Sequence, residues 1–346
     1  MKYRLLGRSA MRVSELALGT MTFGEKWGWG ASLEESRRML DLYLDRGGNF
    51  VDTACNYTDG ESETFLGELL GDRRDHVVLA TKYTLTSDRK DPNAGGNHRK
   101  NMVQTVERSL RRMRTDRIDL LWLHMWDGIT PIEEAMRAFD DLVEAGKILA
   151  VGISDTPAWV ISRAVAIAEL RGWTVPSAIQ LPYSVAGRDV ERELLPMASQ
   201  LGLAVTAWGL LNGGTLTGKY SSPNGEPRRY GDELPSERSA KATAAIKAVA
   251  DDCNATPAQV SIAWALARRP EVNLIPILGA RTVKQLEENL GALNVRLSAE
   301  QVQRLDDSSS FQLGFARSFL GAEDVVELIF GETRPLIEAS VRVIFC

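Results

Sequence analysis

The sequence is poor in the residues that build metal centres and disulfide frameworks. Its 346 residues include only three histidines and three cysteines, and Cys55, Cys253 and Cys346 lie far apart. Because no Cys-x-x-Cys pair occurs, neither a zinc ribbon nor a disulfide framework is expected. The sequence therefore predicts reduced thiols and no metal site.

Long apolar runs and a dominant positive charge are also missing. No run approaches the roughly 18–20 apolar residues of a membrane span, and the N-terminal MKYRLLGRSAMRVSEL has no apolar signal-peptide core. The 41 basic and 46 acidic residues give a net charge of −5 and form no single basic tract. We therefore expect a cytoplasmic protein without a membrane or nucleic-acid partner. Three arginine pairs are interpreted as solvated faces: Arg73–Arg74, Arg111–Arg112 and Arg228–Arg229.

What the sequence does contain is a regular alternation of short β-type runs and longer amphipathic runs. Most of the short runs are continuously apolar, which is typical of parallel strands buried on both faces. A hairpin is expected around Ser9 and Ala10. Eight strands are predicted after it, at residues 16–20, 49–54, 77–82, 118–124, 148–154, 177–183, 203–208 and 273–278. Eight strand–helix repeats favour a closed (β/α)8 TIM barrel over an open doubly wound sheet.

Apolar stripes at helical spacing fill the gaps between these strands. Two of them are Met102–Val106–Leu110–Met113 and Val283–Leu286–Leu290–Leu293. One α/β barrel domain over residues 1–346 is expected, since such barrels often reach this length, with residues 310–346 as a C-terminal extension. The stretch 210–238, rich in Gly, Pro and charge, is expected to be a functional loop. The helical tail after Asp307 is expected to cover an end of the barrel.

Four polar residues lie at or just after the ends of three successive predicted strands. Asp52 and Tyr57 follow the second strand, Lys82 ends the third and His124 ends the fourth. Taken singly, each has an ordinary structural explanation, such as a turn cap, a snorkelling side chain or a satisfied histidine. Because the C-terminal ends of barrel strands meet at one mouth, their conjunction instead predicts a catalytic group.

This set of side chains suits the reduction of a carbonyl group. Hydride transfer to a carbonyl leaves an alkoxide that needs a proton, and a tyrosine can supply it, although its unperturbed pKa is ~10. A neighbouring ammonium group favours the phenolate and lowers that pKa, while a carboxylate holds the ammonium in position. An imidazole can hydrogen-bond the carbonyl oxygen and orient it.

The stretch GGNFVDTACNYTDGESETFLGELL resembles the signature of the aldo-keto reductase superfamily. The matching residues are Asp52, Tyr57, Gly60, Ser62, Glu63 and Gly67. VVLATK and IDLLWLHMWD are similar to the family's lysine and histidine segments, and the resemblance runs from about Leu5 to Leu293. It implies a (β/α)8 barrel and a nicotinamide cofactor. It also implies Tyr57 as general acid–base, Lys82 and Asp52 as its tuning pair, and His124 as substrate orienter.

The cofactor segments carry both matches and departures. No Gly-x-Gly-x-x-Gly follows a strand, so a Rossmann domain is not predicted; the family binds its nicotinamide from the fifth to seventh strands. VGISD is similar to the family's Gly-x-Ser-Asn segment, with Ser154 matching and Asp155 replacing the usual Asn. That replacement removes an amide donor to the carboxamide of the cofactor. The resemblance further implies that Gln180 binds the carboxamide and that Trp208 stacks on the nicotinamide ring.

Two later segments resemble the family's phosphate-binding segments. AWGLLNGGTLTGKY matches at Thr217, although Gly209 and Leu210 replace the usual Ser-Pro, and PILGARTVKQLEENLGAL matches the last cofactor segment. The residues implied to bind the cofactor here are Gly209, Leu211, Gly218, Lys219, Gly279, Arg281, Gln285, Glu288 and Asn289. An arginine at the start of a helix favours a 2′-phosphate, so NADPH is predicted over NADH.

Aromatic residues are predicted to form the walls of the substrate site. Trp27 and Trp29 follow the first strand and Trp126 follows His124, so each is expected to bind a small carbonyl substrate. Phe315 or Phe319 of the tail is expected to close the site. The sequence does not distinguish a sugar-like substrate from an aromatic one, nor a monomer from a homo-oligomer.

Two rival functions are also considered. Some relatives in the family serve as cofactor-binding regulatory subunits of potassium channels, and they keep the same four residues. The other rival function is that of a (β/α)8 hydrolase or isomerase that uses no nicotinamide, since this barrel fold supports many different reactions.

Overall fold

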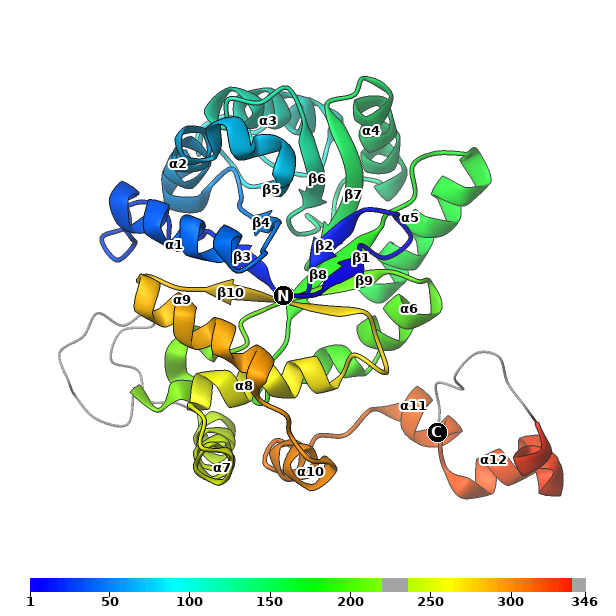
Figure 1. The fold of residues 1–346 in the computed structure, drawn as a ribbon. Coiled ribbons are helices and arrows are strands. Elements are labelled where there is room, and N and C mark those ends of the chain that lie inside the picture. The colour runs from blue at the N-terminus through cyan, green and yellow to red at the C-terminus, as the bar shows by residue number, and fades with distance from the viewer. Residues whose placement is uncertain (220–235, 338–346) are drawn as a thin grey trace.

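Eight parallel strands close into a barrel in the computed structural model, which describes residues 1–219 and 236–337. Helices surround this barrel (Figure 1), so the predicted (β/α)8 fold is confirmed. The strands are β3 (Ala17–Gly19), β4 (Phe50–Asp52), β5 (Val78–Tyr83), β6 (Ile118–Leu123), β7 (Ile148–Ser154), β8 (Ala178–Pro182), β9 (Ala204–Trp208) and β10 (Leu274–Gly279). They lie side by side in chain order, and β10 pairs with β3 to close the ring.

Side chains of unequal size fill the inside of the barrel. The large side chains of Phe50 and Trp122 are fully buried among alanines of β3, β5, β7, β8 and β9. The hairpin of β1 (Tyr3–Leu5) and β2 (Arg12–Ser14) adds Leu6 to this cluster. The predicted hairpin is therefore confirmed, and it plugs the N-terminal end of the barrel, opposite the end where barrel active sites lie.

Most of the helices turn an apolar face towards the barrel, while α7 and α10 pack on α8. They are α1 (Leu33–Asp45), α2 (Glu61–Leu70), α3 (Arg99–Arg112), α4 (Ile132–Glu144), α5 (Ala158–Arg171), α6 (Leu194–Gln200), α7 (Glu237–Cys253), α8 (Pro257–Ala267), α9 (Val283–Leu290) and α10 (Ala299–Asp307). The predicted stripe on α3 is confirmed, since Met102, Val106 and Leu110 are buried. Across the described ranges, no helix is both long and apolar enough to cross a membrane.

The arginine pairs do not all lie on solvated faces. Arg74 and Asp119 form a largely buried ion pair, with 2.7 Å between Nη1 and Oδ2. Arg112 pairs at 3.2 Å with Glu63, whose carboxylate is fully buried. The prediction was wrong for Arg74, because the carboxylate of Asp119, distant in sequence, offsets the cost of desolvating it. The Arg112 side chain stays 32% exposed. Arg228–Arg229 lies outside the described residues.

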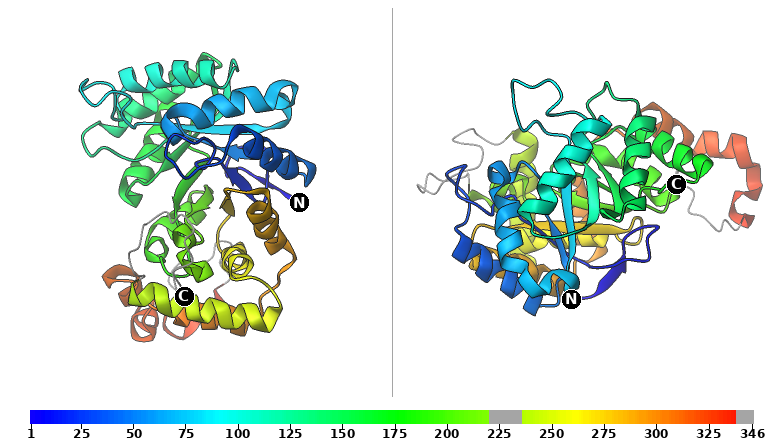
Figure 2. Two further views of the ribbon diagram at one scale, coloured as in Figure 1. Left: turned by 90° about the vertical axis from the view of Figure 1, so that its left-hand side faces the viewer. Right: turned by 90° about the horizontal axis from the view of Figure 1, so that it is seen from above.

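As far as Ile337, where the described part of the chain ends, the C-terminal tail does not close the barrel. Its helices α11 (Phe315–Leu320) and α12 (Glu323–Phe330) extend away from the barrel beyond α10 (Figures 1 and 2). Phe315 is 82% exposed and Phe319 is 52% exposed, and their rings stack on each other. The prediction that the tail covers a barrel end, with Phe315 or Phe319 closing the substrate site, is therefore wrong for the described part of the tail. The tail is held instead at Phe311, whose ring lies under the guanidinium groups of Arg188, Arg192 and Arg238.

The predicted loop 210–238 is described only at its two ends. A 3-10 turn spans Asn212–Thr217, and Ser236 caps the start of α7 by accepting a hydrogen bond from the Ser239 amide. Residues 220–235 lie outside the described part of the chain.

We predict that Gly152→Ala destabilises the barrel by overpacking its interior. Gly152 of β7 is paired in register with Trp122 of β6, and a Cβ atom at Gly152 would lie 2.2 Å from the indole. The free energy of unfolding should fall by about 1–3 kcal/mol, measured as a lower urea midpoint. Gly187→Ala is the control, because its nearest atom would be at 3.4 Å. Equal midpoints for the two variants would show that the indole moves aside without cost.

Candidate active site

The barrel brings the four predicted catalytic residues to one end. Asp52 is the last residue of β4, Lys82 is the last but one of β5, and His124 directly follows β6. Because β4, β5 and β6 are neighbours in the sheet, these side chains meet at its carboxyl edge. Tyr57 opens the 3-10 turn Tyr57–Gly60 after β4, where Thr58 and Asp59 adopt left-handed backbone angles.

Lys82 is the centre of this cluster. Its ammonium Nζ donates to Asp52 Oδ2 at 2.5 Å, to the Thr53 carbonyl at 2.8 Å and to Tyr57 Oη at 3.0 Å. These three acceptors use all three N–H groups of the ammonium. Burial alone would lower the pKa of Lys82, but the charge of Asp52 and the contacts with Tyr57 outweigh it and raise that pKa. The lysine therefore stays charged although it is fully buried.

The second carboxylate oxygen of Asp52 is also occupied. Gln180 of β8 donates its Nε2–H to Asp52 Oδ1 at 3.1 Å. Gln180, which the sequence assigns only to the cofactor, thus also holds the carboxylate that holds Lys82. Neither this contact nor the role of the Thr53 carbonyl has a local sequence signal, because the two partners of the first are 128 residues apart.

His124 is kept neutral by its surroundings. Burial, together with the positive charge of Lys82, lowers the pKa of His124 to about 3. Its ring meets the Tyr57 ring edge to face, with 6.1 Å between centroids. Among the described residues, its buried Nδ1 has no hydrogen-bond partner. A neutral imidazole beside a tyrosine can donate or accept a hydrogen bond, but it is a poor proton donor at neutral pH.

A buried amide holds the loop that carries His124. Asn97 Nδ2 donates to Thr84 Oγ1 at 2.9 Å and to the Met125 carbonyl at 3.0 Å. The Asn97 amide nitrogen donates to Asp127 Oδ2 at 2.7 Å, and Thr84 Oγ1 accepts from the His124 amide at 3.2 Å. These residues join the loops after β5 and β6. Asn97 and Thr84 belong to no motif in the sequence, and the two glycines before Asn97 are the only local sign of a special backbone.

The remaining signature residues stabilise this end of the barrel. Glu63 accepts from Thr81 Oγ1 at 2.7 Å and pairs with Arg112. Gly67 lets α2 approach α3, since a Cβ atom there would lie 2.3 Å from the Arg112 carbonyl oxygen. Ser62 Oγ donates to the Thr20 carbonyl at 2.8 Å. These residues fix the position of the turn that carries Tyr57.

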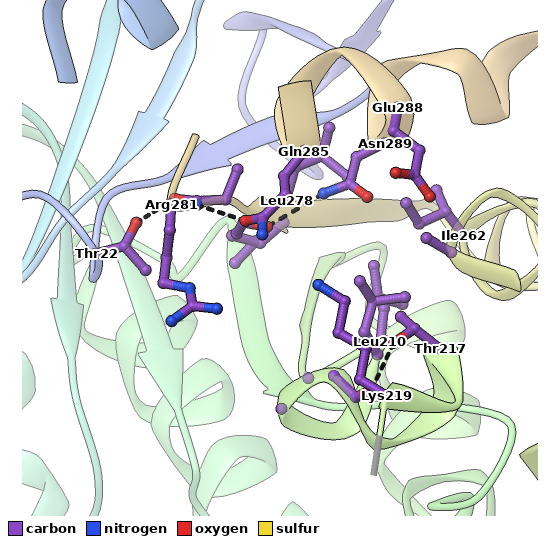
Figure 3. A pocket seen from close by; sticks show the side chains of 18 of the residues that line it. Thr22, Leu210, Thr217, Lys219, Ile262, Leu278, Arg281, Gln285, Glu288 and Asn289 are labelled. Atoms are coloured by element: carbon purple, nitrogen blue, oxygen red, sulfur yellow. Dashed lines mark hydrogen bonds between the residues drawn. The ribbon is translucent and has the colours of Figure 1, made fainter. Parts of the chain in front are cut away.

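The residues predicted to bind phosphates line one pocket between the loops after β9 and β10 (Figure 3). They are Gly209, Leu211, Lys219, Gly279, Arg281, Gln285, Glu288 and Asn289, joined by Thr217. Gly218 does not line the pocket. A Cβ atom at Gly209 or Gly279 would meet no other atom within 4 Å, so the backbone at both positions borders open space.

Hydrogen bonds shape the helix that begins at this pocket. Thr282 caps α9 by accepting from the Gln285 amide at 3.3 Å, and Gln285 Oε1 accepts from the Arg281 amide at 2.9 Å. Asn289 Nδ2 donates to the Gly279 carbonyl at 3.1 Å. The matched residues Gln285 and Asn289 therefore shape the loop, while the Arg281 side chain points into the pocket (Figure 3). Cationic side chains at a helix start suit an anion such as a phosphate.

A third group of predicted residues lies at the ends of β7 and β9. Trp208 Nε1 donates to Asp155 Oδ1 at 3.3 Å, and Asp155 has a left-handed backbone with φ of 40°. Loss of solvent around this carboxylate raises the pKa of Asp155 to about 6, although the Trp208 bond opposes that rise. The buried Ser154 Oγ has no partner within the described chain.

The predicted aromatic walls separate into two groups. Trp126 packs edge to face on Trp159, with 5.4 Å between centroids. Trp159, at the start of α5, was not assigned from the sequence. Trp27 and Trp29 pack on each other at 5.8 Å, but Trp29 also lines the pocket that contains Arg281. Within residues 1–219 and 236–337, no group of three or more His, Cys, Asp or Glu side chains could hold a metal ion.

Comparison with known proteins places most of the chain in one family. The profile described as Aldo/keto reductase family matches residues 15–310. Norsolorinic acid reductase of Aspergillus flavus is 38% identical over 340 residues, which cover 92% of this chain and 84% of that protein. The aryl-alcohol dehydrogenase [NADP(+)] of Phanerodontia chrysosporium is 36% identical over 338 residues, covering 90% and 86%.

We predict that Asp155→Asn makes the protein more stable relative to wild type as the pH rises. The pKa of Asp155 is raised from 3.8 to about 6, so folding favours its protonated form. Ionisation of Asp155 therefore costs stability as the pH rises through this interval, and the amide avoids that cost. The difference in Tm between variant and wild type should be smallest near about pH 4 and largest above about pH 6.

The pH dependence is the informative part of this measurement. Asparagine also tolerates a left-handed backbone well, which adds a difference that does not vary with pH. A constant difference in Tm across the range would mean that the carboxylate ionises normally in the folded protein.

Proposed function

The chain belongs to the aldo/keto reductase family of oxidoreductases, and we propose that it is an NADPH-dependent reductase of small aromatic aldehydes and ketones. The observation that carries this proposal is the buried ammonium of Lys82, which contacts both Asp52 and Tyr57 Oη. The rest of the site is consistent with a proton donor placed beside a carbonyl group.

Tyr57 is the proposed proton donor. Its oxygen accepts a hydrogen bond from Lys82, which stabilises the phenolate left after the proton moves to the substrate oxygen. Asp52 keeps Lys82 charged and in place, and Gln180 holds Asp52. Lys82 thereby acts on the substrate through Tyr57, and Asp52 acts through Lys82.

His124 has the complementary role of orienting the carbonyl oxygen. Its low pKa keeps the imidazole neutral, so it contributes a hydrogen bond and leaves proton donation to Tyr57. The proposed division of labour thus follows from the two charge states: a charged lysine next to the tyrosine and a neutral histidine across from it.

The residues present fit a dinucleotide cofactor. When bound, a reduced nicotinamide supplies the hydride that the carbonyl carbon accepts. Ser154 Oγ, buried and without a partner in the described chain, is a suitable contact for the carboxamide, next to Asp155 and Gln180. The open backbone at Gly209 and Gly279 admits phosphate oxygens. Lys219 and Arg281 supply the positive charge, and Arg281 favours the 2′-phosphate of NADPH.

An aromatic substrate is supported by the site and by the relatives. Trp126 and Trp159 form an edge-to-face pair beyond His124, and such a wall suits a flat apolar ligand. One relative is named an aryl-alcohol dehydrogenase and another reduces norsolorinic acid according to its name. The sequence alone allows both sugar-like and aromatic substrates, and the tryptophan pair and the names of the relatives favour the aromatic ones.

We predict that Tyr57→Phe abolishes most reduction while leaving cofactor binding intact. Loss of the proton donor should lower kcat for NADPH-dependent reduction of benzaldehyde about a hundredfold to ten-thousandfold. The fold and the Kd of NADPH should not change, because the Tyr57 ring does not line the pocket with Arg281. A variant with near wild-type kcat would remove Tyr57 from the proposed mechanism.

We predict that Arg281→Ala removes the preference for NADPH over NADH. The Kd of NADPH should rise about tenfold to a hundredfold, as expected for the loss of charge-assisted hydrogen bonds, while the Kd of NADH stays the same. Lys284→Ala is the charge-matched control, since Lys284 is exposed in the first turn of α9, three residues after Arg281, and does not line the pocket. Parallel weakening of both nucleotides would argue against a 2′-phosphate contact.

A further inference from the structure

The loop between β3 and α1 is folded into a closed ring. Its two ends are joined because the Gly24 amide donates to the Ala31 carbonyl at 3.0 Å and the Ala31 amide donates to the Thr22 carbonyl at 2.7 Å. Gly30 allows this closure, since a Cβ atom there would lie 1.8 Å from the Gly24 carbonyl oxygen. The tryptophans of this loop are therefore carried on a backbone of defined shape.

This ring is attached to the turn that carries Tyr57. Glu61 Oε2 accepts from the amides of Glu25 at 2.8 Å and Lys26 at 3.2 Å. Thr58 Oγ1 donates to the Phe23 carbonyl at 2.6 Å. One side of the ring is thus fixed to the start of α2.

The opposite side of the ring is attached to the phosphate segment. Thr22 Oγ1 donates to the Ala280 carbonyl at 2.5 Å, directly before Arg281 (Figure 3). Trp29 lines the same pocket as Arg281 and Lys219, and its side chain is half-buried. Trp27, two residues earlier, does not line that pocket and donates from Nε1 to Asp59 Oδ1 at 3.4 Å.

We propose that Trp29 is a nucleotide-binding residue whose indole packs against the bound NADPH in the pocket of Arg281. This inference rests on the proposed NADPH-dependent function. The pocket contains two cationic side chains but neither Tyr57 nor His124, so its chemistry suits the phosphate and adenosine portion of a dinucleotide. An indole face is a good surface for stacking a nucleotide base. The predicted role of Trp29 in binding the carbonyl substrate is replaced by this one.

The test is a calorimetric titration of the full chain and its variants with two ligands. One ligand is NADPH, and the other is adenosine 2′,5′-bisphosphate, which lacks the nicotinamide. Trp29→Ala should raise the Kd of both by about tenfold, as expected when a stacked aromatic is lost. Trp173→Ala is the control, because Trp173 is also half-buried but packs on Arg137 and does not line the pocket, so both Kd values should stay unchanged. The KM of Trp29→Ala for benzaldehyde at saturating NADPH should also stay unchanged.

A milder pair of variants gives the same information if removal of the indole disturbs the loop. NADPH quenches tryptophan fluorescence when it binds close by, so Trp29→Phe should lose more of the quenching than Trp173→Phe, whose indole packs on Arg137 outside the pocket. Both variants keep an aromatic ring, and their circular dichroism spectra should match wild type. Equal loss of quenching in the two variants would contradict the proposal.

The remaining outcomes separate this proposal from the proposed function. If Trp29→Ala binds both ligands as wild type does while Arg281→Ala binds NADPH weakly, Trp29 is not a nucleotide contact and the NADPH-dependent function stands. A raised benzaldehyde KM with unchanged Kd values would return Trp29 to the substrate site. If folded wild-type protein binds no NADPH, the proposed function itself fails.

Discussion

A single buried ammonium group organises the active end of this barrel. Lys82 is fully enclosed, and its charge is tolerated only because Asp52, the Thr53 carbonyl and Tyr57 accept all of its N–H groups. Those partners come from β4 and the turn after it, while Gln180 of β8 fixes the far side of Asp52. Any shift between these strands would leave a charge without a partner in the interior. The geometry of the site is therefore held by the same interaction that sets its chemistry.

Residues around the Lys82 cluster hold the members of that cluster in place without contacting Lys82. Glu63 and Arg112 fix α2 against α3, which positions the turn of Tyr57. Asn97 joins the loops after β5 and β6, which positions His124 and the aromatic wall beside it. Many of the signature residues that the sequence shares with its family thus support the site and do not take part in the proposed reaction. This explains why Asp52, Glu63 and Lys82, three charged side chains that are almost completely buried, lie together at one end of the barrel.

The fold and the meeting of Asp52, Tyr57 and Lys82 at one end of the barrel could be predicted because both depend on local pattern and order. Continuously apolar runs mark buried parallel strands, and polar residues at the ends of neighbouring strands must meet. The contacts that could not be predicted join distant parts of the chain, such as Gln180 with Asp52 or Arg74 with Asp119. The tail was misjudged for a related reason. The apolar face of a tail helix does not show in the sequence which surface it will pack against. In the structure, the contacts of Phe311 with Arg188 and Arg192 turn the tail away from the barrel mouth.

The pairing of β10 with β3 means that the first and last strands of the barrel share one seam. The Thr22–Ala280 hydrogen bond and the pocket of Arg281 both straddle that seam. During synthesis, β4, β5 and β6 can come together around Lys82 long before Leu274–Gly279 leaves the ribosome. The pocket of Arg281, in contrast, exists only when the whole barrel has been translated. A ligand that binds there stabilises completed chains alone, so chains that end before Leu274 would gain no stability from it.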